Sequence, residues 1–218
     1  MKIPVYFMPG LAASSTIFDR IYLPEEIFEK YVLDWVLPNK RETLQHYAKR
    51  MAEKVTHENA ILIGVSFGGL VVQEMKPFLK TKKIIIISSI KCNSEMPRRM
   101  KIARTTKAFK LLPTSWIKDV DGLIKYAFGD TLKRKLKLYE KYLYMRNTEY
   151  LDWAIEKMIC WERSETDPEI IHIHGDADEV FPIKNIKKHI SVAGGTHAMI
   201  LIKYNWFNSH LPKIILEE

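Results

Sequence analysis

Cysteine is scarce in this chain of 218 residues, which contains Cys92 and Cys160 and no others. Two isolated cysteines provide neither a disulfide framework nor the paired spacing of a metal site. Long apolar runs are also absent, because the most apolar stretch, residues 84–87, is far shorter than the roughly 20 residues of a membrane helix. Pro9 and Gly10 interrupt the N-terminal residues before the apolar centre of a signal peptide can form. These absences predict a protein of the reducing cytoplasm without a transmembrane segment.

The composition is that of a folded domain. Hydrophobic residues make up 47% of the chain and charged residues 28%, which is enough apolar material to offset the entropy of ordering the chain. The sequence contains no internal repeats and no low-complexity tracts. Its length fits one domain with an insertion better than two domains.

The positive charge is unevenly distributed. The formal net charge is +8, yet residues 91–150 alone contain 15 Lys and Arg against 6 Asp and Glu, a net charge of +9. One segment therefore holds all the excess positive charge, and the rest of the chain is close to neutral.

Apolar stretches in the first ninety residues predict buried strands, and these strands occupy residues 2–8, 31–37, 60–65 and 83–88. Helical periodicity between them predicts helices over residues 44–55 and from Leu70 to Met75, the second ended by Pro77. Strands that are apolar on both faces and alternate with helices indicate an α/β fold with a mostly parallel sheet covered on both sides.

This rhythm is interrupted between residues 91 and 168, where the apolar residues recur at helical spacing. The helical patterns run from Ile102 to Phe109, from Leu132 to Leu143 and from Leu151 to Met158. Strands return at residues 169–174 and 189–193, followed by one long closing helix from about Ala198. The pattern predicts one α/β core, residues 1–90 and 169–218, interrupted by a helical insertion, residues 91–168.

Ser66 lies in the sequence Gly64-Val65-Ser66-Phe67-Gly68, between a predicted strand and a predicted helix. A serine on so sharp a turn needs small residues two positions away on each side. Its hydroxyl would project at the start of a helix, where backbone N–H groups stabilise developing negative charge. The alternative is a tight strand-to-helix turn that uses small residues without catalysis.

A serine hydroxyl needs an adjacent base to act as a nucleophile near neutral pH. His197 is the candidate, because it follows the last predicted strand in a glycine-containing loop. The alternative is a water-exposed histidine at a helix start. The remaining candidates fall on or beside predicted helices or strands and are less suited: His46, His57, His172, His189 and His210.

An acid must orient the base. The loop after the strand at residues 169–174 contains Asp176 and Asp178. Asp178 is the predicted acid and Asp176 the second choice, although either aspartate could instead stabilise the turn by bonding to its own backbone.

Together, the GVSFGG, HGDADEVFP and GGTH sequences resemble the α/β-hydrolase family in content and in the order serine, aspartate, histidine. The resemblance covers the two flanks of the chain and implies a sheet of about six strands. The family's acid position supports Asp178. It also implies an oxyanion hole formed by the backbone N–H groups of Phe67 and Leu11, although Pro9 stands where the family usually has histidine.

In this family, the segment that residues 91–168 occupy commonly forms a cap over the active site. Its aromatic and methionine residues could line an acyl pocket or simply pack the helices together. Its basic clusters, residues 98–104 and 133–141, could attract an anionic substrate, contact an anionic membrane surface, or form a solvated face.

The resulting hypothesis is a serine hydrolase of carboxylic esters or thioesters that uses Ser66, His197 and Asp178 and needs neither cofactor nor metal. The expected partner is a small acyl substrate, and the basic clusters are compatible with an anionic one. Acyl transfer to an acceptor other than water would use the same residues. The alternatives are a non-catalytic binding protein of the same fold and a basic module for an anionic partner or membrane. No nucleic-acid partner is expected, because no binding motif accompanies the charge.

Overall fold

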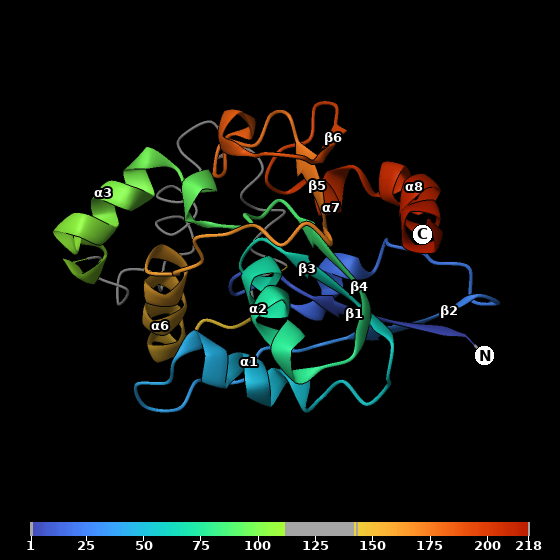
Figure 1. Ribbon diagram of the computed structural model, residues 1–218, viewed down its shortest axis with the longest axis horizontal. Helices are drawn as coiled ribbons and strands as arrows, with labels where there is room; N and C mark the ends of the chain where they lie inside the picture. Colours follow the sequence, from blue (N-terminus) through green and yellow to red (C-terminus); the bar gives the residue numbers. More distant parts are fainter. Residues whose placement is uncertain (1, 112–141, 143, 218) are drawn as a thin grey trace.

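The computed structural model describes residues 2–111, 142 and 144–217 (Figure 1). The strands in this part of the chain are β1 (Ile3–Met8), β2 (Phe28–Val32), β3 (Ala60–Val65), β4 (Thr81–Ile87), β5 (Ile170–Gly175) and β6 (Ile190–Val192). The α-helices are α1 (Leu44–Ala52), α2 (Phe67–Met75), α3 (Arg98–Thr106), α6 (Thr148–Ile159), α7 (Met199–Ile202) and α8 (Tyr204–Leu216). Short 3-10 helices are η1 (Ser15–Phe18), η2 (Lys76–Phe78), η3 (Asn93–Glu95), η4 (Ala108–Leu111) and η7 (Ile183–Asn185).

The strands form one six-stranded sheet in the order β2-β1-β3-β4-β5-β6. Every neighbouring pair is parallel, which confirms the predicted α/β class. Because parallel strands point the same way, their carboxyl ends meet at one edge of the sheet. The loops that contain the candidate site residues all leave from that edge.

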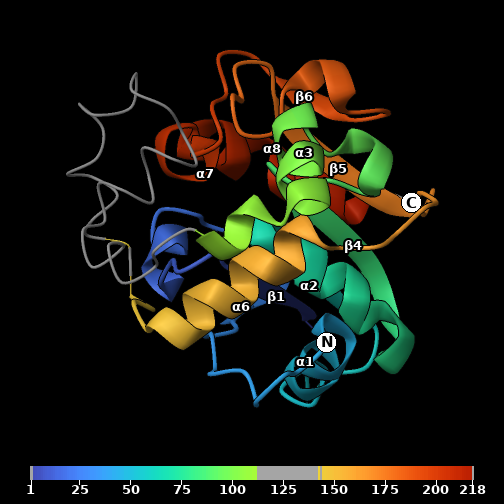
Figure 2. The same cartoon turned by 90° about the vertical axis from the view of Figure 1, so that its left-hand side faces the viewer.

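The strands are buried on both faces because their side chains alternate between two apolar layers. Residues on one face pack with α1, α2 and α6, and they include Tyr6, Met8, Leu62, Ile84 and Ile86. Residues on the other face pack with η1, α7 and α8, and they include Val5, Phe7, Ile61, Ile63 and Ile85. Figures 1 and 2 show these two helical layers on opposite sides of the sheet.

Two predicted boundaries were wrong. The second strand is Phe28–Val32 rather than residues 31–37, because the ladder with β1 pairs Ile3 with Phe28 and Phe7 with Val32. Glu29 and Lys30 are exposed in this edge strand, so its sequence lacks the continuous apolar pattern of a strand buried on both faces. The single closing helix is divided into α7 and α8, since Lys203 departs from helical geometry, with φ −106° and ψ 24°.

The described part of residues 91–168 is helical, as predicted, and lies beside the carboxyl edge of the sheet (Figure 2). In it, α3 and α6 match the first and third helical patterns, whereas the pattern from Leu132 to Leu143 falls outside the described residues apart from Tyr142. Tyr150, Leu151 and Trp153 of α6 belong to the same apolar layer as α1 and α2. Among the described residues, no helix is long and apolar enough to cross a membrane.

Candidate active site

Ser66 occupies the junction between β3 and α2, with a φ of 51° and a ψ of −118°. A positive φ strains a residue that has a side chain, at a cost of about 1–3 kcal/mol. Two hydrogen bonds hold the residue in this conformation. The Ser66 N–H donates to the Ile87 carbonyl (2.9 Å), and Ser89 Oγ donates to the Ser66 carbonyl (2.8 Å). The strain is therefore offset by neighbours on β4 and the loop after it.

The glycines on either side of Ser66 are required by close backbone approach. A Cβ on Gly64 would collide with the backbone of Gly68, and a Cβ on Gly68 would collide with the carbonyl oxygens of Met8 and Pro9. Backbone atoms cannot move aside cheaply, so both positions must stay without a side chain. The same close packing brings the turn after β1 against Ser66.

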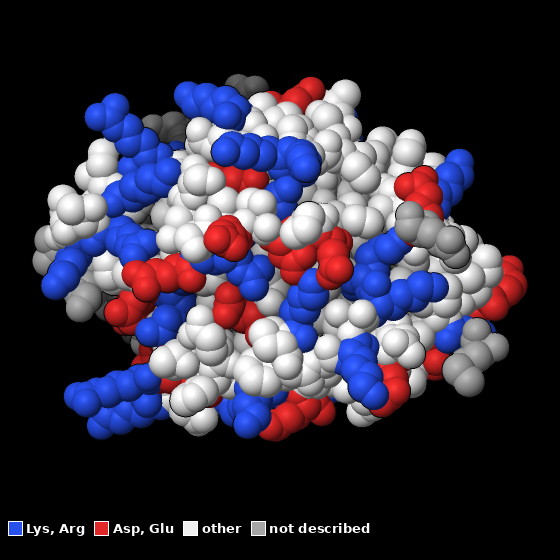
Figure 3. Space-filling model, in the orientation of Figure 1, with Lys and Arg blue, Asp and Glu red and all other residues white. Residues whose placement is uncertain are grey.

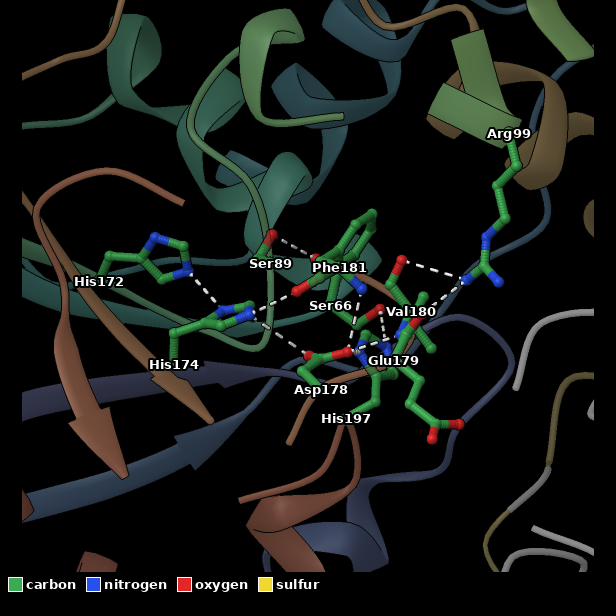
Figure 4. Close-up of polar contacts among 10 residues, drawn as sticks. All are labelled: Ser66, Ser89, Arg99, His172, His174, Asp178, Glu179, Val180, Phe181 and His197. Carbon is green, nitrogen blue, oxygen red and sulfur yellow. Dashed lines mark hydrogen bonds and ion pairs between the residues drawn. The ribbon is translucent and has the colours of Figure 1, made fainter. Parts of the chain in front are cut away.

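His197 lies between β6 and α7, and its Nε2 is 2.9 Å from Ser66 Oγ (Figure 4). The loop that contains it is fixed by a hydrogen bond from the Ala177 N–H to the Gly195 carbonyl (3.0 Å). The ring of Phe181 packs edge-on against the imidazole, with centroids 5.5 Å apart. His197 is only 9% exposed, so its imidazole is held rather than free in solvent.

Asp178 is buried and pairs with His197: its Oδ2 is 2.9 Å and its Oδ1 3.2 Å from His197 Nδ1. Oδ1 also accepts the N–H groups of Val180 (2.8 Å) and Phe181 (2.9 Å). Burial opposes ionisation of the carboxyl, but the interactions with His197 and the Phe181 N–H outweigh it and lower the pKa of Asp178. The group is therefore a carboxylate at neutral pH.

The other aspartate of this loop has a different partner. Asp176 is exposed, and its Oδ1 accepts the Gly194 N–H at 2.7 Å. Its contact joins the loop after β5 to the loop after β6, which is a structural task. The geometry therefore brings Asp178, the first choice from the sequence, to His197 and leaves Asp176 outside the hydrogen-bonded chain.

The hydrogen bonds fix the tautomer of His197. A carboxylate can only accept, so the hydrogen of the neutral imidazole resides on Nδ1 and points at Asp178. Nε2 is then left with a lone pair toward Ser66 Oγ. Such an arrangement can take a proton from the hydroxyl and stabilise the resulting imidazolium.

Sequence reasoning did not single out His174, which contacts the same acid loop. His174 Nε2 donates to the Phe181 carbonyl (2.8 Å) and is 3.6 Å from Asp178 Oδ2, while His174 Nδ1 is 3.0 Å from His172 Nε2. Burial lowers the pKa of His174 and lowers that of His172 still further, so both rings are neutral at neutral pH. The available signal was their spacing of two residues, which places both on one face of β5.

The two residues predicted to supply an oxyanion hole lie close to Ser66. Phe67 is the first residue of α2, where a backbone N–H has no partner within the helix. Leu11 follows Gly10, at which an added Cβ would be 3.5 Å from the Ser66 Cβ. Within the described residues, neither the Leu11 nor the Phe67 N–H has a hydrogen-bond acceptor. Both donors are therefore free to receive a ligand oxygen.

Comparison of the sequence with protein-family models and with curated proteins finds no match. The structure, however, is similar to an esterase from Thermogutta terrifontis, with a TM-score of 0.72 and 14% identity over 99% of this chain and 90% of the esterase. A bromoperoxidase from Bacillus anthracis gives a TM-score of 0.71 and 15% identity over 100% of this chain and 93% of its own. An enol-lactonase from Burkholderia xenovorans gives a TM-score of 0.71 and 12% identity over 100% of this chain and 92% of its own.

These similarities cover nearly the whole chain and show that it has the α/β-hydrolase fold, as the three sequence motifs predicted. The three proteins have different names and activities, so their likeness establishes architecture alone. Function has to be argued from the side chains at the carboxyl edge of the sheet.

Proposed function

We propose that the protein is a serine hydrolase of carboxylic esters or thioesters, with Ser66 as nucleophile, His197 as general base and Asp178 as the orienting acid. The observation that carries the proposal is the continuous hydrogen-bonded chain from Ser66 Oγ through His197 to Asp178. Its hydrogen-bonding directions are those that proton removal from the hydroxyl needs. The esterase and lactonase among the structural neighbours agree with this class of reaction.

The first half of the reaction forms an acyl-enzyme. Ser66 Oγ attacks the substrate carbonyl carbon while His197 Nε2 takes the hydroxyl proton. The carbonyl π electrons move to the oxygen, and the N–H groups of Leu11 and Phe67 stabilise that oxyanion. When the tetrahedral intermediate collapses, the bond to the alkoxide or thiolate breaks and His197 returns the proton to the leaving group.

The second half releases the acid. Water attacks the acyl-enzyme, His197 takes a proton from that water, and the same two N–H groups stabilise the second oxyanion. Collapse restores the Ser66 hydroxyl with the proton held by His197. An alcohol or thiol in place of water would give acyl transfer by identical steps. Both halves are completed by side chains and backbone of this chain.

The proposal is tested by labelling the purified protein with a fluorophosphonate probe and by following hydrolysis of a short p-nitrophenyl ester. Both signals should disappear in Ser66→Ala. Ser209→Ala, which removes an exposed hydroxyl of α8 bonded to the Asn205 carbonyl, should leave both signals unchanged. Labelling that persists in Ser66→Ala would contradict the assignment. A folded wild-type protein with neither signal would favour the non-catalytic binding protein instead.

We also propose that residues 91–168 form a cap over this site. Support comes from the apolar cluster of Phe109, Ile155 and Ile159, against which the partly buried Leu11 packs. The described helices of the insertion thus contact the turn that provides one oxyanion donor. In this proposal, the acyl chain of a substrate packs beside this buried apolar cluster. Replacing Ile155, a residue of α6, with Phe should lower kcat/KM for long p-nitrophenyl esters more than for the acetate ester, and an unchanged chain-length profile would argue against an acyl pocket there.

The basic surface of α3 favours a negatively charged substrate. This helix and its C-cap contain Arg98, Arg99, Lys101, Arg104 and Lys107 and no acidic residue. Arg99 Nη2 donates to the carbonyls of Glu179 and Val180, in the loop that holds Asp178 (Figure 4). Blue side chains gather accordingly over α3 and the neighbouring C-terminal loops in Figure 3. Positive potential beside a site raises the rate of capture of anions.

Steering by this surface is tested with two esters that differ only in a terminal carboxylate. Arg98→Glu combined with Lys101→Glu should lower kcat/KM for the anionic ester by about tenfold at low salt and leave the neutral ester unchanged. The effect should shrink as salt is added. The matched control is Lys40→Glu with Lys54→Glu, two exposed residues flanking α1. Equal losses in both double variants would refute a local role for α3.

A further inference from the structure

The turn after β1 is held by an aromatic side chain from a different part of the chain. Trp35 follows β2 and is 5% exposed. Its indole N–H donates to the Gly10 carbonyl at 2.9 Å. The same carbonyl accepts the Ala13 N–H at 3.0 Å, so both hydrogen bonds hold one peptide group in a fixed plane.

That peptide group also contains the Leu11 N–H. The chain has no cis peptide bond among the described residues. In a trans peptide, the carbonyl and the following N–H point in opposite directions within one rigid plane. By holding the Gly10 oxygen, Trp35 therefore sets the direction of the Leu11 N–H, which points away from the indole. Rotation of this peptide would misdirect the donor without moving Ser66 or His197.

The Trp35 ring also contacts the residue that provides the second donor. Its centroid is 5.4 Å from that of Phe67, with an angle of 18° between the rings. The stack keeps the Phe67 side chain, and with it the first turn of α2, against the loop after β2. One side chain thus touches both Phe67 and the peptide before Leu11.

The insertion holds the other end of the same turn. The Ala12 N–H donates to Tyr150 Oη of α6 (3.4 Å), and the Ala12 carbonyl accepts the N–H groups of Tyr144 and Met145 (2.9 and 3.2 Å). Ala12 has a φ of 60°, which is strained for alanine and needs such support. Trp35 and Tyr150 are themselves in contact, with ring centroids 5.5 Å apart.

We propose that Trp35 is a positioning residue that preorganises the oxyanion hole, with Tyr150 supporting the same turn from the insertion. The inference rests on the proposed hydrolase function and adds to it the group that aims the Leu11 donor. Preorganised donors stabilise the transition state because they need no reorientation when the oxyanion forms. Trp35 itself touches no substrate atom in this scheme.

The test is Trp35→Phe, which keeps an aromatic ring and removes the indole donor. Loss of a whole oxyanion donor lowers kcat by about 10²–10³-fold. Because the Ala13 N–H still holds the Gly10 carbonyl, we expect about a tenfold fall in kcat, with KM within about twofold of wild type. The inhibition constant of a trifluoromethyl ketone, whose adduct places an oxyanion in the hole, should rise by a similar factor.

Trp153→Phe is the matched control. Trp153 is 7% exposed, and its indole N–H donates to the Glu42 carbonyl at 2.8 Å. Trp153→Phe therefore loses the same kind of buried hydrogen bond, at Glu42 rather than at the oxyanion turn. It keeps an aromatic ring beside Phe67 and Tyr150, whose centroids lie 6.0 and 6.3 Å from that of Trp153. Both variants should lose similar thermal stability, but Trp153→Phe should keep kcat and the inhibition constant within about twofold. Equal kinetics in the two variants would overturn the role of Trp35.

Two further measurements separate this inference from the function on which it rests. If Ser66→Ala keeps wild-type turnover, the hydrolase proposal fails and the role of Trp35 fails with it. If turnover depends on Ser66 but not on Trp35, only the positioning role is wrong. Amide hydrogen exchange reads the turn directly: exchange at Ala12 and Ala13, whose N–H groups donate to Tyr150 Oη and to the Gly10 carbonyl, should accelerate in Trp35→Phe and stay unchanged in Trp153→Phe. Unchanged exchange in both would also refute the inference.

Discussion

Replacing Asp178 with Asn tests the site most sharply, because the substitution changes one heavy atom. Asp178 Oδ1 accepts two backbone N–H groups while Oδ2 faces His197 Nδ1 at 2.9 Å. An Asn oxygen would keep the two backbone bonds, which turns the amide NH₂ toward the imidazole. His197 Nδ1 must then accept, so its hydrogen moves to Nε2 and points at Ser66. The base loses the lone pair that receives the hydroxyl proton.

The expected fall in kcat is about 10⁴-fold, or about 5.5 kcal/mol of transition-state stabilisation, with KM little changed. The matched control is Asp176→Asn, whose amide oxygen can still accept the Gly194 N–H. It should keep kcat within about threefold. Steady-state hydrolysis of a p-nitrophenyl ester would measure kcat and KM for both variants. The reasoning is refuted if Asp178→Asn stays active, and the assignment passes to Asp176 if that variant alone is inactive.

Two other predictions concern stability. Gly68→Ala should lower Tm by about 5 °C in calorimetry, because its Cβ collides with the carbonyls of Met8 and Pro9, whereas Gly10→Ala meets only ordinary contacts and should stay within about 2 °C. The second follows from His172 and His174, whose pKa values burial holds below the ordinary 6.5. Below about pH 6.5, the unfolded chain therefore binds protons that the folded chain does not, and the free energy of unfolding decreases as the pH falls. His172→Leu removes one of these protons, so its Tm should fall less steeply than that of wild type between about pH 7 and pH 5. Parallel curves for the two proteins would contradict this explanation.

The sheet was predictable because its signal is local. Residues 60–65 and 84–87 are apolar without interruption, as expected of strands that are buried on both faces. Phe28–Val32 was not predictable in the same way, because an edge strand has one partner strand and one solvated side. Its exposed Glu29 and Lys30 interrupt the apolar pattern by which a strand is predicted. Strand boundaries there depend on pairing with β1, which is a tertiary property.

The residues of the hydrogen-bonded chain were predictable for a related reason. Ser66, Asp178 and His197 each lie in a short turn whose geometry demands particular neighbours, such as glycines where backbones touch. The geometry of each turn can therefore be predicted from the residues next to it. The choice between Asp178 and Asp176 could not be made from the turn alone, because both carboxylates accept backbone N–H groups. What differs is the distance to His197, which the rest of the fold determines.

The residues that support the oxyanion turn cannot be predicted from the sequence in this way. Trp35 and Tyr150 are separated by more than a hundred residues, and each bonds to a backbone atom of the turn. Every amino acid offers a carbonyl oxygen such as that of Gly10, and every amino acid except proline offers an N–H such as that of Ala12. A motif search cannot detect such contacts, because a backbone hydrogen bond does not require a particular amino acid at the turn. The same reasoning explains why Pro9, in place of the histidine usual in α/β-hydrolases, is compatible with the proposed oxyanion hole. If the donor is a backbone N–H, its direction depends on the groups that hold the neighbouring carbonyl, and in this structure an indole holds it.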